Sequence, residues 1–175
     1  QHLIAQGYEG PNPWHDHANS GVDGDGSVLS GWLLENSRRA ANIHEADSET
    51  PWLTGQALEF LDSRPEGGPG WLCHLSYIKP HWPYVVPEPW ASMFGPGDVV
   101  PAVRDPGELR DPHPVYRAFL EGRIGRAFAR DDVREAVIPA YMGLIAQCDA
   151  EFGRLLDHLA ATGRMEDTMI VLTSD

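Results

Sequence analysis

The chain ends in Thr168-Met169-Ile170-Val171-Leu172-Thr173-Ser174-Asp175, and this stretch decides the expected fold. Residues 168–173 form a short β-branched and apolar block, which predicts a buried strand of a parallel sheet. Ser174 and Asp175 follow at the carboxyl end of that strand. Ligands and metals bind at this edge of open α/β sheets, so Asp175 is a candidate metal ligand. We expect the chain to end inside an active site.

A second strand is expected over residues 71–77, which follow a turn rich in proline and glycine. Between the two strands lies the strongest helical pattern in the chain, and Gly163 is well placed as its C-terminal stop. A strand, a long excursion, a helix and a strand make a crossover unit, whose strands run parallel in one sheet. His81, shortly after the first strand, and Asp175 would then face one pocket.

The predicted fold class is therefore α/β, within one domain. The chain divides into four stretches: loop-rich residues 1–50, a helix and a strand in 51–77, an excursion rich in proline and tryptophan in 78–131, and a helix and a strand in 132–175. The excursion cannot be regular structure, and we expect it to wrap over the body with short helical turns around 115–129.

Local signals predict where the two main helices begin. Pro51 suits the first position of a helix over 51–64. Asp132 and Glu135 have the spacing of a capping box at a later helix start. Pro139 either kinks that helix or begins the next one.

The formal net charge of −13 argues against nucleic-acid binding, because a phosphate backbone needs a basic face, so no nucleic-acid partner is expected. No apolar run is long enough to cross a bilayer, and no membrane partner is expected. A small anionic substrate is compatible with the charge, because a local site can oppose the global sign. Self-association as a homo-oligomer stays open.

His81 and Asp175 are the two candidates for chemistry. Pro80 and Pro83 stand on either side of His81-Trp82 and limit where the imidazole can point. A rigid histidine at a ligand edge can protonate a leaving group. The alternative is a loop histidine that bonds a carbonyl group. Asp175 could equally be a helix N-cap. Lys79 offers a second positive group, but a solvated lysine is expected.

Other polar and sulfur-containing residues are expected to be structural. His15-Asp16-His17 looks like a metal pair, but a polar loop is favoured because no further ligands stand at suitable spacing. The acidic stretch 23–27 lacks the glycine and glutamate of a calcium loop. Cys73 and Cys148 are expected to be free buried thiols.

Two motifs resemble the sulfatase family of the alkaline phosphatase superfamily. The first is the helix with Asp149 and Gly153-Arg154-Leu155-Leu156, followed by Asp167 and the Thr168–Asp175 strand. The second is the strand from Trp71 that leads to Pro80-His81-Trp82-Pro83. The segment from Met93 to Pro114 looks most like the phosphonate monoester hydrolase branch. The resemblance covers roughly residues 45–175.

The resemblance implies an alkaline-phosphatase-like sandwich, with a mostly parallel central sheet flanked by helices, only partly represented in this chain. Asp175 resembles the family's aspartate metal ligand, and His81 resembles the histidine that contacts the sulfate or phosphoryl group. The family nucleophile is a cysteine or serine, often oxidised to formylglycine, in a C-x-P-S-R type motif. No such motif occurs here, and we expect it upstream of Gln1.

The resemblance therefore implies an internal fragment of a hydrolase that acts on small anionic esters, either sulfate esters or phosphonate monoesters and phosphodiesters. The implied cofactor is a divalent metal ion, Ca²⁺, Mn²⁺ or Mg²⁺. The isolated fragment would be inactive. The alternative is a sulfatase-like binding or interaction module that has lost the nucleophile.

Overall fold

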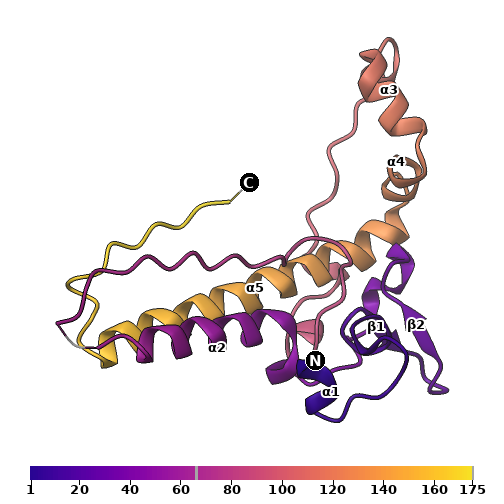
Figure 1. The fold of residues 1–175 in the computed structure, drawn as a ribbon. Helices are drawn as coiled ribbons and strands as arrows, with labels where there is room; N and C mark the ends of the chain where they lie inside the picture. Colours follow the sequence, from indigo (N-terminus) through magenta and orange to yellow (C-terminus); the bar gives the residue numbers. More distant parts are fainter. Residues whose placement is uncertain (66, 175) are drawn as a thin grey trace.

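The computed structural model describes residues 1–65 and 67–174, and its centre is a pair of helices that run in the same direction (Figure 1). Helix α2 spans Glu49–Asp62 and helix α5 spans Asp131–Ala161. The two helices contact each other, and their buried leucines are Leu61, Leu144 and Leu159. Since full burial of a leucine contributes about 1.5–3 kcal/mol, these contacts form much of the support for the body.

Helix α5 begins at a different residue from the one that the sequence predicted. Helix α5 continues through Pro139, so of the two predicted alternatives the proline does not begin a new helix but lies inside one. The capping-box prediction at Asp132 is wrong, because the N-cap is Arg130, two residues earlier, and Asp132 lies within the first turn of the helix. The Asp132 carboxylate instead accepts hydrogen bonds from the Arg130 guanidinium. The helix predicted over 51–64 is α2, which begins two residues before Pro51.

Residues 71–77 and 168–173, the two predicted strands, are extended but belong to no sheet within residues 1–65 and 67–174. A strand needs a neighbour for its backbone groups, and the described chain supplies none to either segment. Both segments run in the same direction, as the crossover predicted (Figure 1). Apolar side chains on them lie open, with Leu72 90% exposed and Leu172 76% exposed. The parallel sheet is therefore not formed in this part of the protein.

The first 50 residues form a small unit of short elements and loops. Helix α1 spans His2–Ala5, and strands β1 (Ser20–Val22) and β2 (Val28–Ser30) pair antiparallel. Buried Ala41 and Ile43 from this unit pack with Val85, which follows the Pro80–Pro83 run. Further short helical turns lie at Trp14–Ala18, Leu34–Arg38, Glu45–Asp47, Trp90–Ser92, Pro96–Asp98 and Pro106–Leu109.

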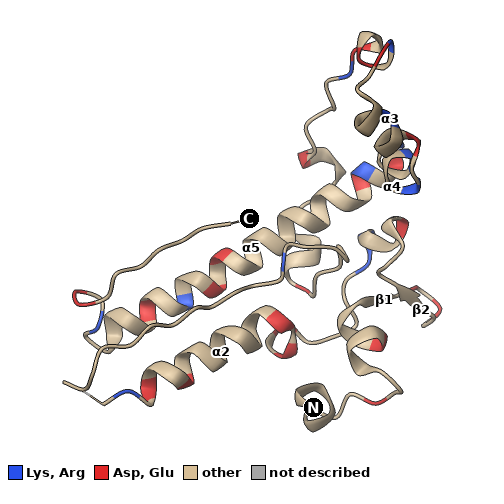
Figure 2. Cartoon of the chain, turned by 45° about the horizontal axis from the view of Figure 1, so that its top comes forward, with Lys and Arg blue, Asp and Glu red and all other residues tan. Residues whose placement is uncertain are grey.

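Helices α3 (Pro114–Glu121) and α4 (Arg123–Phe128) form an arm that projects from the body, which confirms the predicted helical turns in this region (Figure 1). Arginine positions recur along the arm and at the start of α5, with acidic positions among them (Figure 2). Arg104 contacts the junction between α4 and α5. Its guanidinium donates to Ala129 O at 3.0 Å and to Asp131 Oδ1 at 3.2 Å. No helix in the described part of the chain is both long and apolar enough to cross a membrane.

Candidate functional site

The segment that leads to His81 is fixed to both long helices. The Tyr77 hydroxyl lies 2.7 Å from the hydroxyl of Thr54, which is fully buried in α2. Two residues later, the Cys148 thiol on α5 donates to the carbonyl oxygen of Lys79 at 3.4 Å. Burial raises the pKa of that thiol, so it stays a neutral donor. Both cysteines are free, as predicted, although each is only partly buried. The loop after Tyr77 therefore starts from a defined position.

His81 lies on the surface of this loop, and its ring is held on one side. The backbone N–H of His81 donates to Ile78 O at 3.0 Å. The ring nitrogen Nδ1 lies 2.7 Å from Trp82 O, and because a carbonyl oxygen only accepts, Nδ1 carries the proton of this bond. Within residues 1–65 and 67–174, Nε2 has no hydrogen-bond partner. Nε2 is thus the ring atom without a partner in this part of the protein.

Lys79 contradicts the expectation of a solvated lysine. Its ammonium group turns inward, where Nζ donates to Pro83 O at 2.7 Å and lies 3.5 Å from His81 O. Burial lowers its pKa to about 8, and the nearby negative charge of Glu49 only partly opposes that shift. The period-two alternation of an extended segment could have indicated this placement. Burial alternates along the extended segment, and Lys79 falls on the same inward side as Tyr77.

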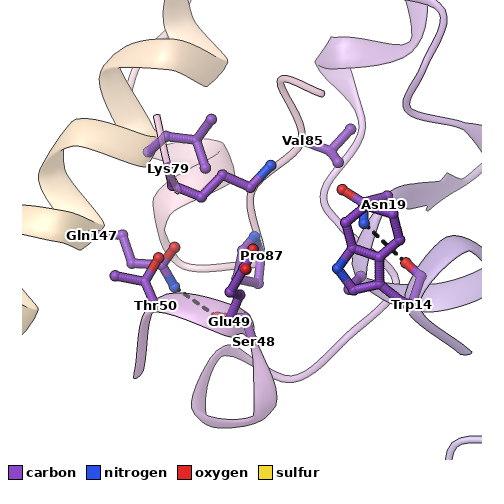
Figure 3. A pocket seen from close by; sticks show the side chains of 11 residues that line it. Trp14, Asn19, Ser48, Glu49, Thr50, Lys79, Val85, Pro87 and Gln147 are labelled. Carbon is purple, nitrogen blue, oxygen red and sulfur yellow. Dashed lines mark hydrogen bonds between the residues drawn. The ribbon is translucent and has the colours of Figure 1, made fainter. Parts of the chain in front are cut away.

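A small pocket lies beneath the loop, between the N-terminal unit and the two long helices (Figure 3). Lys79 and Glu49 supply its charged groups, and the amide of Gln147 donates to Ser48 Oγ at 3.0 Å on its wall. Its volume is about 20 Å³, which is room for one or two water molecules. The pocket is therefore too small for an ester substrate. The other residues that line it are Trp14, Ala18, Asn19, Thr50, Val85, Pro87 and Leu144.

Aromatic side chains brace the other side of the loop. The Trp82 ring meets Trp32 edge to face, with centroids 4.4 Å apart. Trp32 in turn donates from Nε1 to His15 Nδ1 at 3.1 Å. Aromatic pairs of this geometry add about 0.5–1.5 kcal/mol beyond their burial. The N-terminal unit thus holds the residue next to His81, a contact that the sequence did not predict.

The structure does not bring His81 and the predicted metal ligand into one described site, because Asp175 lies outside the described residues. In residues 1–65 and 67–174, no three His, Cys, Asp or Glu side chains form a group that could hold a metal ion. His15 and His17 are engaged elsewhere, since His15 accepts from Trp32 and His17 Nε2 lies 2.8 Å from Glu9 O. The described part of the chain does not by itself make a metal centre.

Comparison with protein families identifies the class. The sulfatase family model matches residues 9–175, and the chain belongs to the sulfatase family. A curated relative, a multifunctional alkaline phosphatase superfamily protein of Trinickia caryophylli, is 30% identical over 149 residues, which are 78% of this chain and 29% of that protein. A choline-sulfatase of Rhizobium meliloti is 27% identical over 154 residues, 86% of this chain and 29% of that protein.

Two solved structures of phosphonate monoester hydrolases share the fold. The enzyme from Silicibacter pomeroyi matches with a TM-score of 0.69 and 28% identity, over 95% of this chain and 33% of that chain. The enzyme from Agrobacterium radiobacter matches with a TM-score of 0.65 and 26% identity, over 75% of this chain and 28% of that chain. The chain thus spans about three tenths of the length of the curated relatives and solved structures named here.

Proposed function

We propose that the protein containing this chain is a metal-dependent hydrolase of sulfate esters or of phosphonate monoesters and phosphodiesters. Membership of the sulfatase family, together with the named hydrolases among its relatives, supports the reaction class. The observation in the structure that carries the proposal is His81, an exposed residue whose ring is held through Nδ1 while Nε2 has no partner among the described residues.

His81 acts in this proposal as the general acid. When the bond between sulfur or phosphorus and the ester oxygen breaks, that oxygen gains negative charge and takes the proton from His81 Nε2. Trp82 O accepts the Nδ1 proton at 2.7 Å and so holds the orientation of the ring before transfer. General acid catalysis of this kind contributes about 10²- to 10⁴-fold in rate.

Asp175 is the proposed ligand of the divalent cation. When bound, such a cation lowers the pKa of the nucleophile and draws charge from the non-bridging oxygens. Ca²⁺, Mn²⁺ and Mg²⁺ are the candidates, because all three prefer oxygen ligands. The described residues do not complete a metal site, so the remaining ligands come from other parts of the protein.

The exposed extended segments belong to the same proposal. Residues 71–77 and 168–173 have unpaired backbones and open apolar side chains, which is costly for an isolated strand. In the complete protein these segments are two parallel strands of the central sheet of an alkaline-phosphatase-like sandwich. Their common direction would deliver His81 and Asp175 to the same edge of that sheet (Figure 1).

The nucleophile belongs to the protein outside these residues, since the chain contains no C-x-P-S-R motif. The 175-residue chain alone is therefore expected to be inactive. If the complete protein also lacks a nucleophile, it is instead a sulfatase-like binding module. Neither substrate class is favoured over the other by the residues described here.

The test is an assay of the complete protein on a matched pair of substrates, an aryl sulfate and the corresponding aryl phenylphosphonate. We expect turnover of at least one substrate, loss of activity in chelator, and recovery on addition of Mn²⁺ or Ca²⁺. The 175-residue chain, assayed in parallel, should show none. If neither substrate is turned over with any of the three cations, the hydrolase proposal fails and a sulfatase-like binding module is favoured.

A further inference from the structure

We infer that Lys79 is a positioning residue for His81: its partly buried ammonium group closes the loop that carries the imidazole and sets the direction of Nε2. This inference rests on the function proposed for His81. Lys79 is four residues before Pro83, and its Nζ donates to the Pro83 carbonyl oxygen at 2.7 Å. One side chain thus spans the loop on which His81 lies.

The hydrogen bonds around the loop leave His81 little freedom. The carbonyl of Lys79 accepts from Cys148 on α5, and the ammonium of Lys79 holds the far end of the loop at Pro83. Between these two points, the His81 N–H bonds Ile78 O and its ring bonds Trp82 O. Loss of the ammonium would free the Trp82–Pro83 backbone, and the ring would turn with the carbonyl that holds it.

The burial of a cation here needs an explanation, because an ammonium group loses hydration when it is enclosed. Glu49 on α2 is the acidic group that faces it, and Cys148 on α5 is the other titratable group nearby. In the described part of the chain, neither Glu49 nor Cys148 is hydrogen-bonded to Lys79 Nζ. The hydrogen-bond partners of Nζ are the carbonyl oxygens of the loop. The lowered pKa of Lys79 agrees with this incomplete compensation. An apolar residue of similar length would avoid the cost of lost hydration. The presence of a cation is therefore better explained by the loop carbonyl that it bonds, Pro83 O.

Direct contact between Lys79 and substrate is not favoured by the geometry. Nζ points under the loop, and the pocket that it lines has a volume of only about 20 Å³. Lys79 therefore acts through His81 and is not itself a catalytic residue. Its loss should affect the substrates that need the His81 proton and spare those that do not.

The experiment uses the complete protein and four variants: Lys79→Met, Lys79→Arg, His81→Ala and the double variant Lys79→Met/His81→Ala. Each is assayed on aryl esters whose leaving groups range from 4-nitrophenol to phenol. We expect Lys79→Met to lower kcat for the phenyl ester by about 10- to 100-fold, with less loss for the 4-nitrophenyl ester and little change in KM. Lys79→Arg, which keeps a cation, should recover part of the loss. The double variant should be no slower than His81→Ala alone, because two residues that act through one step are not additive.

The outcomes separate this inference from the function on which it rests. If His81→Ala shows no dependence on the leaving group, the function proposed for His81 fails. If His81→Ala shows that dependence but Lys79→Met slows all esters equally, or adds its full loss to His81→Ala, the positioning role is overturned. Thermal unfolding of each variant identifies a general loss of structure, which would likewise appear as equal loss on all esters.

Discussion

The backbone carbonyl of Trp90 packs directly against Gly143, at a distance that only glycine permits. A Cβ atom added at Gly143 would lie 2.5 Å from Trp90 O and 3.2 Å from Val86 Cγ1. The absence of a side chain at Gly143 therefore allows the segment after the His81 loop to lie directly against helix α5. The position of that segment is set by backbone contact with a helix.

Gly143→Ala should therefore destabilise the protein, by about 1–3 kcal/mol for a forced overlap in a packed site. Gly153→Ala is the matched control, because Gly153 lies in the same helix and a Cβ there meets nothing within 4 Å. The control should be neutral or stabilising by about 0.5–1 kcal/mol, the usual gain of alanine over glycine in a helix. Denaturant unfolding of both variants measures the difference. Equal stabilities would contradict the close approach of Trp90.

His81→Ala should lower kcat for phenyl esters by about 10²- to 10⁴-fold, because the departing oxygen then lacks a proton donor. The loss should be smaller for esters of 4-nitrophenol, whose oxygen leaves without protonation. His44→Ala is the control, since His44 is exposed and lies outside the His81 loop and both extended segments. Steady-state kinetics with both esters checks the prediction, and a similar loss in the two variants would argue against a special role for His81.

The stability of the protein should respond to pH through Lys79. Its pKa is about 8 in the folded chain and 10.5 for an ordinary lysine, so between these values the unfolded chain holds a proton that the folded chain has released. Stability rises with pH wherever the unfolded state binds more protons. The stability of the wild-type protein relative to Lys79→Met should therefore increase from about pH 8 to pH 10. Denaturant titrations at pH 7.5 and 9.5 would reveal a constant difference if Lys79 is in fact solvated.

Asp175→Ala should reduce the amount of bound divalent metal and raise the metal concentration needed for activity. A single carboxylate is one ligand of several, so we expect weaker binding with loss of kcat. Asp167→Ala is the control, since Asp167 is an exposed acid close by in sequence. Metal content by elemental analysis and activity against added Mn²⁺ measure both effects. Unchanged metal content in Asp175→Ala would remove this residue from the proposed metal site.

Much of the local structure followed from sequence patterns. The apolar stripe and Pro51 predicted α2, and the long periodic run before Gly163 predicted the body of α5. The capping box failed because Arg130 takes the Asp132 carboxylate, a short-range competition that spacing alone does not reveal. The strands at 71–77 and 168–173 were predicted from β-branched and apolar content. Their pairing stays a prediction, because a strand depends on a neighbour that the described chain does not contain.

Only part of the candidate site was predicted, because some of its contacts join segments that are distant in sequence. His81 was identified from its place between prolines after an apolar run, and the structure adds the Trp82 carbonyl that holds its ring. Lys79 was expected to be solvated, although the alternation that places Tyr77 inward also applies to Lys79. The contact of Trp82 with Trp32 joins residues 50 positions apart and leaves no local pattern.

The sequence by itself determined the family, the helices and the residues that carry the proposed chemistry, because these depend on residue types and on spacing within one segment. The tertiary structure decided which groups hold the His81 loop: the partly buried ammonium of Lys79, the thiol of Cys148 and the ring of Trp32. Two of these contacts join segments far apart in the chain, and the third depends on a lysine turning inward. Such contacts form only when the helices and loops have packed, so no local pattern specifies them.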